Sequence, residues 1–371
     1  MDRNAKHTAI RIGCFLLLLV TILWGTNRIF KFKYGDGIYD LTKFYQLEDD
    51  TVDVLILGSS HAFEDINTGL LWDEHGMASF ILSGSMQPMW NTYYYLKEAL
   101  KTQKPSLIIL EAYMAGFPEE YADDSRIIKN NFGLKLSADK IRSLQASVPP
   151  GRFPEFFLEY IQYHNRYREL GMADILPDQG YELYKDWKGY GCNMDTIPQE
   201  NSDISGVTET VDLKEKSEHY LRKTIELAKE RDIPVLILVS PYASVSDVEQ
   251  MVFNRTEEIA AEYGVEFINY NLNYRELGID YEEDAGDAFH LNYKGSRKLT
   301  EALGKHLKSR YDIPDRRGDA RYDSWERHAA YLRRIIGEQE EKEKYSWKTT
   351  PVRTARPRAA ARETEEIPCS A

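Results

Sequence analysis

Short apolar runs alternate with amphipathic stretches along most of this chain. Five runs are continuously apolar and partly β-branched, a pattern typical of parallel strands buried on both faces. They occupy residues 52–57, 79–82, 106–110, 233–239 and 265–268, and the helical patterns between and after them occupy 90–102, 213–230, 248–263 and 294–308. The alternation predicts an α/β fold, a flavodoxin-like three-layer α/β/α sandwich around a central parallel sheet.

The N-terminal residues follow a different pattern, because residues 10–30 carry only Arg11 and Arg28 as charges. About twenty apolar residues match a hydrocarbon core of about 30 Å. A cleavable signal peptide fits less well, since no small-x-small site follows Trp24. A helix buried in a soluble domain would not carry leucines on every side. We expect an uncleaved transmembrane anchor within residues 1–33.

The basic residues around this anchor do not decide its orientation. Three precede the span and three follow it, namely Arg3, Lys6 and Arg11 against Arg28, Lys31 and Lys33. An N-terminal anchor before a large folded domain usually leaves that domain outside the cytoplasm. We therefore expect a single-pass protein of the cell membrane with an extracytoplasmic domain.

The rest of the chain divides by pattern into further parts. A polar connector at 34–50 precedes the α/β domain at 51–310, a charged helical extension is expected at 311–345, and a tail rich in Thr, Pro, Arg and Ala at 346–371 is expected to be disordered. The α/β domain contains an insertion at 112–212 that is too long for a plain crossover.

Within the insertion, aromatic residues recur at helical spacing between 153 and 167. Such a stripe is typical of a helix that buries its aromatic face against the main domain. The other interpretation is a cap whose exposed rings stack on sugar faces at the mouth of a pocket. The sequence leaves both open.

Composition excludes several classes of function. The net charge of -13 argues against a nucleic-acid-binding face. Three cysteines, Cys14, Cys192 and Cys369, are too few for a disulfide framework or a thiolate zinc site. There is no grouping with metal-ligand spacing and no glycine-rich phosphate loop. We expect no metal and no cofactor.

Two short motifs at opposite ends of the domain carry candidate chemistry. Ser60 follows the first strand within Gly58-Ser59-Ser60, and Asp287 lies three residues before His290 ahead of the last helix. A serine hydroxyl is a poor nucleophile unless an imidazole takes its proton and a carboxylate orients that imidazole. Order, spacing and topology together predict a Ser60–His290–Asp287 catalytic triad at the carboxyl edge of the sheet.

Each half of this site also has a structural interpretation. A serine after a strand is commonly the N-cap of the next helix, and an Asp and a His three apart commonly lie in a solvated loop. Ser59 is the weaker nucleophile, since its side chain should point back toward the sheet. His61, next to the nucleophile, is expected at the rim of the pocket or behind it.

With these motifs the chain resembles the SGNH/GDSL hydrolases. Gly58-Ser59-Ser60 matches their first motif, with Ser59 in place of the usual acid, and Asp287-Ala288-Phe289-His290 matches their last. The Gly-Ser-Ser form looks more like the branch of membrane-anchored proteins that transfer D-alanine to lipoteichoic acid or acetylate alginate. The resemblance covers residues 52–307 and implies an SGNH hydrolase fold.

The resemblance also assigns an oxyanion hole, in which the N–H groups of Ser60 and Gly84 are the expected donors. Gly84 follows the second strand, where a turn glycine is an equally good interpretation. The third motif departs from the family, because Glu111-Ala112-Tyr113 stands where an asparagine usually donates. Asn91 is a candidate replacement donor. His164 is a candidate for the cap side of the pocket, against a plain helix-face role.

We therefore expect a membrane-anchored serine esterase or O-acyltransferase that acts on acyl esters of a cell-surface glycan or polymer. The resemblance implies a membrane acyltransferase as partner. The alternative is a non-catalytic binding or scaffold component of a cell-envelope polysaccharide acylation machine, which the altered third motif favours and the complete Ser, His and Asp set opposes.

Overall fold

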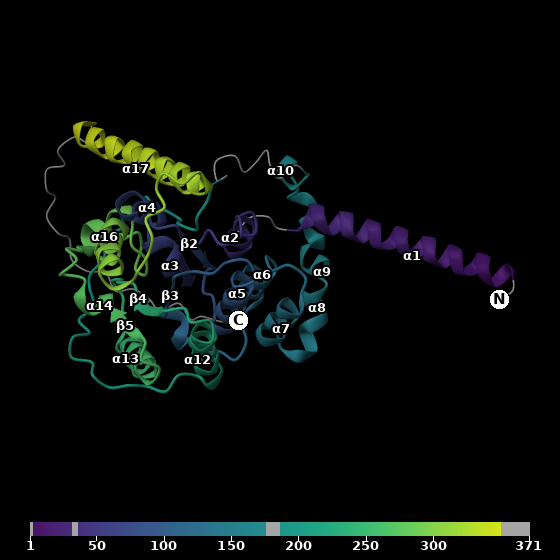
Figure 1. Ribbon diagram of the computed structural model, residues 1–371, viewed down its shortest axis with the longest axis horizontal. Helices are drawn as coiled ribbons and strands as arrows, with labels where there is room; N and C mark the ends of the chain where they lie inside the picture. Colours follow the sequence, from purple (N-terminus) through teal and green to yellow (C-terminus); the bar gives the residue numbers. More distant parts are fainter. Residues whose placement is uncertain (1–2, 32–35, 176–185, 350–371) are drawn as a thin grey trace, which may run out of the picture.

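The computed structural model describes residues 3–31, 36–175 and 186–349. Its centre is one sheet of five parallel strands in the order β2-β1-β3-β4-β5 (Figure 1). The strands are β1 (Val54–Gly58), β2 (Ser79–Ser83), β3 (Leu107–Glu111), β4 (Val235–Val239) and β5 (Glu266–Asn269). This is the strand order of a flavodoxin-like doubly wound sheet. The predicted fold class is confirmed, and each strand lies within two residues of its predicted bounds.

The strands are apolar throughout because both faces of the sheet are covered. Along β1, Leu55 and Leu57 enter one core, while Val54 and Ile56 enter the core on the opposite face. All four are fully buried. Alternation of side chains along a strand requires such continuous apolar sequence when helices pack on both sides.

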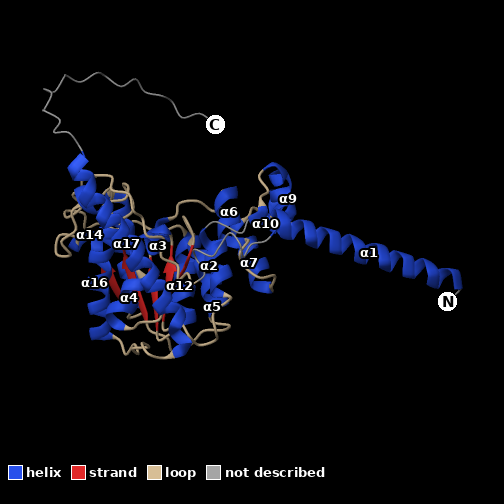
Figure 2. Cartoon of the chain, turned by 90° about the horizontal axis from the view of Figure 1, so that it is seen from above, coloured by secondary structure: helices blue, strands red, loops and turns tan. Residues whose placement is uncertain are grey.

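Helices cover the two faces in separate groups (Figures 1 and 2). One face carries α2 (Asp36–Phe44), α5 (Met89–Ala99), α12 (Glu215–Lys229) and α13 (Asp247–Glu262). The other carries α3 (Ser60–Asp65), α4 (Thr68–His75) and α16 (Tyr293–Arg310), and α17 (Asp323–Thr349) packs on α4. Short elements α14 (Tyr270–Asn273), α15 (Tyr281–Asp284) and η5 (Ala320–Tyr322) lie in the connections.

The stretch expected as a polar connector contains the helix α2. Ile38, Leu41 and Phe44 are buried by packing against the sheet and α6. Their spacing places them on one face of a single helix, although the polar residues between them hide this pattern in so short a segment. The α/β domain therefore begins at α2 rather than at β1.

The insertion after β3 contributes a set of short helices. They are η1 (Tyr113–Gly116), α6 (Asp124–Asn131), α7 (Ala138–Ser147), η2 (Pro150–Arg152), α8 (Phe153–Phe157), α9 (Tyr160–Tyr163), η3 (His164–Arg168) and α10 (Met172–Ile175). α6 packs on α2, α7 packs on α5, and α9 and α10 reach α1. After residue 185 the insertion continues without helix or strand to α12.

The helix α1 (Arg3–Phe30) projects away from the rest of the molecule (Figure 1). Among the described residues it is the one helix whose length and composition suit a membrane span, at Ala5–Phe30, and none of its most apolar window is buried. A signal sequence would pass the same test. At the other end, α17 runs four residues past the expected extension, and the remainder of the expected tail lies outside the described residues.

Candidate active site

Ser60, His290 and Asp287 lie together at the carboxyl edge of the sheet. The Ser60 hydroxyl is 2.8 Å from His290 Nε2, and His290 Nδ1 is 3.0 Å from each carboxylate oxygen of Asp287. With Nδ1 protonated, the imidazole donates to Asp287 and accepts the Ser60 proton at Nε2. The structure thus brings the three predicted side chains into one proton relay.

The turn between β1 and α3 sets the position of Ser60. Gly58 has a φ of +155°, and a Cβ there would lie 2.7 Å from Glu111 Cβ, so only glycine fits this close approach to β3. Ser59 is the N-cap of α3 and its hydroxyl accepts from the His61 N–H. Ser60 is therefore the first residue of the helix, where backbone N–H groups lack partners within the helix.

The loop that carries His290 is held closed by its own hydrogen bonds. Ala285 and Leu291 form an isolated β-bridge, and the Gly286 N–H donates to the His290 carbonyl at 2.9 Å. Asp287 Oδ1 accepts the N–H groups of Phe289 at 2.7 Å and of His290 at 2.9 Å. The carboxylate is thus fixed before it meets the imidazole.

These bonds keep Asp287 ionised. Partial burial alone would raise the pKa of Asp287, but hydrogen bonds from the His290 ring and from the backbone N–H groups of Phe289 and His290 outweigh it, and the pKa is lowered. An ionised carboxylate at Nδ1 stabilises the imidazolium that forms when His290 takes a proton.

Glu111, from the departing third motif, braces the nucleophile turn from β3. One oxygen accepts from the Ser59 hydroxyl at 2.9 Å and from the Ser59 N–H at 3.3 Å, and the other accepts from the Tyr113 N–H at 2.7 Å. Full burial raises the pKa of Glu111 to about 7, although these hydrogen bonds oppose the shift. Ser59 is engaged with this carboxyl group, as its expected direction toward the sheet implies.

His61 is buried behind the triad rather than at a rim. Its ring stacks on Tyr113 at 4.1 Å between centroids and lies 5.0 Å from the His290 ring. Its Nδ1 is 3.6 Å from the buried carboxylate of Asp65. Burial, and then the electrostatic effect of the nearby His290 ring, lower the pKa of His61, so it packs as a neutral imidazole. Asp65 accepts the Leu291 N–H at 2.9 Å and so links α3 to the His290 loop.

Gly84 stands beside the nucleophile turn. Gly58 pairs with Ser83 across β1 and β2, so Ser60 and Gly84 both lie just past the ends of adjacent parallel strands.

Asn91, by contrast, does not face the oxyanion site. Its side-chain amide donates to four acceptors from α6 and α7, among them Asn131 Oδ1 at 3.1 Å. We therefore no longer assign Asn91 to the oxyanion site.

The surroundings of Gly84 yield a prediction. A Cβ at Gly84 would lie 2.2 Å from Asn130 Oδ1, and the buried Asn130 amide is tied to the carbonyls of Ser85 and Arg126. The change Gly84→Ala should therefore cost about 1–3 kcal/mol of unfolding free energy through overpacking. Thermal unfolding would measure the loss, and Gly84→Ala combined with Asn130→Ala should be less destabilised than the sum of the two single changes. Strict additivity would contradict this contact.

Only part of the aromatic stripe is buried, on short helical segments and against another residue of the insertion. Phe156 and Tyr163 are fully buried, and both pack against Phe132 with centroids 6.5 and 5.4 Å away. The helices that carry them lie beside α1, with α2 and α6 between them and α3 (Figures 1 and 2). His164 is exposed there, with Nδ1 2.6 Å from the Ile161 carbonyl. The structure does not bring His164 or these rings to Ser60.

Three aromatic residues that the sequence analysis did not assign to the site adjoin the triad. Tyr113 and Tyr242 pack edge to face at 5.6 Å, and Phe289 lies 6.3 Å from Tyr242. Phe289 is 43% exposed although it sits between Asp287 and His290. Its position within the DxxH motif was the one signal available, because the other two rings arrive from distant segments.

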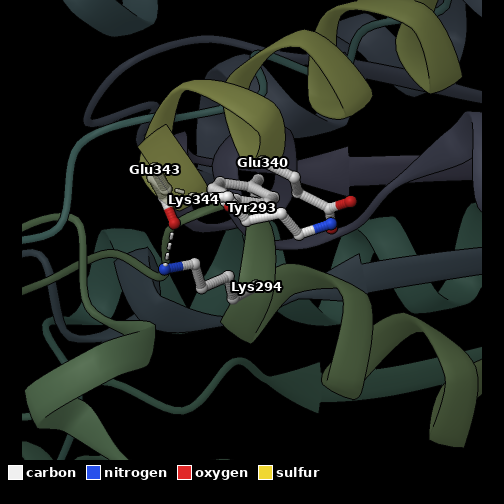
Figure 3. Close-up of a pocket in the computed structure, with 5 residues that line it drawn as sticks. All are labelled: Tyr293, Lys294, Glu340, Glu343 and Lys344. Atoms are coloured by element: carbon white, nitrogen blue, oxygen red, sulfur yellow. Dashed lines mark hydrogen bonds and ion pairs between the residues drawn. The ribbon is translucent and has the colours of Figure 1, made fainter. Parts of the chain in front are cut away.

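A separate hollow lies between α16 and α17 (Figure 3). It is lined by Tyr293, Lys294, Glu340, Glu343 and Lys344. Lys294 pairs with Glu343 at 2.8 Å, and Tyr293 donates to the same carboxylate at 3.3 Å. These contacts tie the end of α17 to α16, and the hollow includes no member of the triad. No group of three or more His, Cys, Asp or Glu side chains within 3–31, 36–175 and 186–349 could hold a metal ion.

Comparison with known proteins adds little to this geometry. No protein-family model and no curated protein matches the chain. Similar solved structures include a protein provisionally named an acylhydrolase from Bacteroides fragilis, with a TM-score of 0.36, 10% identity and coverage of 72% of this chain and 94% of that one. Another is an acetyl xylan esterase from the rumen bacterium Butyrivibrio proteoclasticus, with a TM-score of 0.31, 9% identity and coverage of 70% and 64%. Both scores are too low to bear on the function of this chain.

Proposed function

We propose that this chain is a serine-dependent acyl-ester hydrolase or O-acyltransferase of the SGNH/GDSL kind. The observation that carries the proposal is the 2.8 Å contact between the Ser60 hydroxyl and His290 Nε2, with Asp287 bonded to the other ring nitrogen. Nucleophile, base and orienting group in hydrogen-bonded sequence are the signature of nucleophilic acyl transfer.

The reaction follows from these positions. Ser60 Oγ attacks the carbonyl carbon of an ester while its proton passes to His290 Nε2. The tetrahedral intermediate collapses when His290 returns that proton to the leaving alcohol oxygen, which leaves the acyl group on Ser60. Water or an acceptor hydroxyl then attacks the acyl carbon, with His290 taking its proton and returning it to Ser60.

The oxyanion of the intermediate would be held by the N–H groups of Ser60 and Gly84. Two donors rather than three make a weaker hole, since one donor supplies about 2.7–4 kcal/mol of transition-state stabilisation. The carboxyl group of Glu111 replaces the third donor and is bonded to Ser59 and Tyr113. A weak hole fits a transferase whose site is completed by a partner, and the resemblance suggests a membrane acyltransferase for that role.

The substrate is proposed to be an acyl ester of a cell-surface glycan or polymer. The apolar, unburied α1 supports an anchor that holds the domain outside the cytoplasm. The exposed ring of Phe289 next to His290 supplies an apolar surface of the sort that sugar rings stack on. The acyl group and its acceptor follow from neither feature.

The second candidate is a non-catalytic scaffold component of a polysaccharide acylation machine. One observation favours it: a fully buried carboxyl group, Glu111, stands where the family places an oxyanion donor. In that case the three aligned side chains would bind an ester without cleaving it.

A fluorophosphonate probe separates the two candidates, because it phosphonylates only a serine that is activated as a nucleophile. We expect full-length protein to be labelled, labelling to be lost in Ser60→Ala, and labelling to persist in the control Ser309→Ala, an exposed serine on α16. Absence of labelling in the wild type would favour the scaffold. Equal labelling of wild type and Ser60→Ala would remove Ser60 as the nucleophile.

The same chemistry tests the location of the domain. A charged fluorophosphonate that does not cross the cytoplasmic membrane should label the wild type in cells whose cytoplasmic membrane is intact. Labelling that appears only after this membrane is broken would place the domain in the cytoplasm. That outcome would contradict the proposed topology and leave the chemistry of Ser60 untouched.

A further inference from the structure

Exposed apolar side chains gather in one segment of the insertion. Outside α1, more than half of the large hydrophobic side chains that are exposed in the described part of the chain lie between residues 157 and 175. We call six of them the apolar patch: Phe157, Leu158, Tyr160, Ile161, Tyr167 and Met172, which are 37–64% exposed. A concentration of this kind marks an interaction surface, whereas single exposed leucines do not.

The patch is continuous with the end of α1. The Tyr160 ring packs edge to face on Phe30 at 5.8 Å, and Arg166 donates to the Phe30 carbonyl. Lys31 pairs with Glu159 at 3.2 Å. In Figure 1, α8, α9 and α10 form a column that runs across this end of α1 rather than along it. A helix that crosses a bilayer and a segment that lies along its surface meet in this way.

Two acids of the same segment, Glu159 and Asp174, are turned inward, whereas Glu169 is 67% exposed. Glu159 is 10% exposed and pairs with both Lys31 and Lys140. Asp174 is 5% exposed and pairs with Arg166 at 3.1 Å. A water-facing helical segment buries its apolar residues and exposes its acids, so the arrangement is reversed at these two positions. At these positions the acids are paired inside the protein, and aromatic and aliphatic side chains face outward. Such a surface suits a bilayer, whose interior is apolar and whose headgroups can be negatively charged.

The length of α1 places the patch at the depth of the headgroups. The candidate span Ala5–Phe30 has 26 residues, about 39 Å of helix at about 1.5 Å per residue. A hydrocarbon core of about 30 Å lies within a bilayer of about 40–45 Å. Phe30 therefore falls in the interfacial layer, where tyrosine side chains accumulate. Tyr160, in contact with Phe30, falls at the same level. The exposed Arg168 lies within the patch, with its guanidinium 5.3 Å from the Tyr167 ring, where a lipid phosphate would be its partner.

From this geometry we propose that the apolar patch lies in the headgroup layer of the membrane that α1 spans, so that lipid covers it. The proposal rests on the membrane anchor in the proposed function and goes beyond it. A span alone does not fix the orientation of the domain relative to the bilayer, whereas a second membrane contact does. The patch would hold the sheet in one orientation relative to the bilayer. The connection runs through α7, which packs on α5, and through α6, which packs on α2.

Depth-dependent quenching tests this proposal on the full-length protein. The protein would carry Cys14→Ser and Cys369→Ser, while Cys192 stays because it is buried and burial raises its pKa to about 11. Leu158→Cys would be labelled with a polarity-sensitive dye and reconstituted, without any other protein, into phosphatidylcholine and phosphatidylglycerol vesicles that contain nitroxide-labelled lipid. Val248→Cys on α13, 61% exposed, is the matched control, and Leu19→Cys marks the span.

We expect dye at Leu158→Cys to shift its emission to the blue and to lose most of its intensity to headgroup-level nitroxide, with Val248→Cys unaffected. Quenching of Leu19→Cys by acyl-chain nitroxide, without quenching of Leu158→Cys by headgroup-level nitroxide, would overturn the lipid contact and leave the anchor standing; the patch would then be a site for a protein. Absence of quenching at both positions would reject the anchor as well. Fluorophosphonate labelling of the same vesicles shows, independently of the quenching, whether the protein is folded with a reactive Ser60.

Discussion

Changing Ser60 to alanine should lower kcat for an activated acetyl ester by a factor on the order of 10⁴–10⁶, the range found when a triad serine is removed. The loss is large because alanine cannot form the acyl intermediate, so water must attack the ester directly. His290→Ala should produce a similar loss, since the Ser60 hydroxyl then has no base at 2.8 Å. Initial rates with p-nitrophenyl acetate, on protein in detergent micelles, provide the measurement.

The combination Ser60→Ala and His290→Ala sharpens this test. Side chains that act as one relay lose their effect together, so the double variant should be no slower than either single variant. Asp287→Asn should cost about 10⁴, because an amide favours the wrong imidazole tautomer. His164→Ala, beside α1, is the control and should leave kcat unchanged. Losses that multiply in the double variant would show that Ser60 and His290 act independently.

The second large effect concerns stability, and it arises from Glu111. Burial raises the pKa of this carboxyl group from 4.5 to about 7. The folded state therefore binds the Glu111 proton more tightly than the unfolded state does. The stability from this difference is fully present below pH 4.5 and is lost as the pH rises through 7. At about 1.4 kcal/mol per pKa unit, the loss is about 3 kcal/mol.

The substitution Glu111→Gln should remove this pH dependence. A glutamine cannot ionise, but its NH₂ group cannot accept the Ser59 N–H, which costs about 1–3 kcal/mol at every pH. The wild type should thus be the more stable protein at pH 5 and should lose its advantage by pH 8. Urea unfolding at a series of pH values would measure the difference. Glu262→Gln is the control, because Arg222 lowers the pKa of this exposed acid and its titration lies below the range tested.

Local patterns in the sequence were sufficient to predict the fold. The strands at 54–58 and 235–239 are short apolar runs between polar segments. Each can be recognised from its own sequence, without knowledge of the strand it pairs with. Parallel strands joined by helices then leave few topologies, and all of them align the carboxyl ends of the strands. For this reason the sequence placed Ser60 and His290 at the same edge of the sheet.

The errors fall where contacts are long-range. Asn91 was a reasonable oxyanion donor by residue type, yet its amide is saturated by groups from α6 and α7, which only packing brings together. His61 was expected at the rim of the pocket or behind it, and only the packing of Tyr113 and Asp65 around it decides for the position behind the triad. No periodicity along the chain reports which neighbours a polar side chain will meet.

The sequence by itself determined the α/β class, the apolar N-terminal helix and the residue types available for acyl transfer, since each depends on neighbours within a few positions. Tertiary structure alone decided that Ser60 and His290 touch across 230 residues of sequence, that Glu111 braces Ser59, and that the insertion meets α1. These contacts join segments that are distant in the sequence. Because the core is close-packed, each of them depends on the side chains of many segments together.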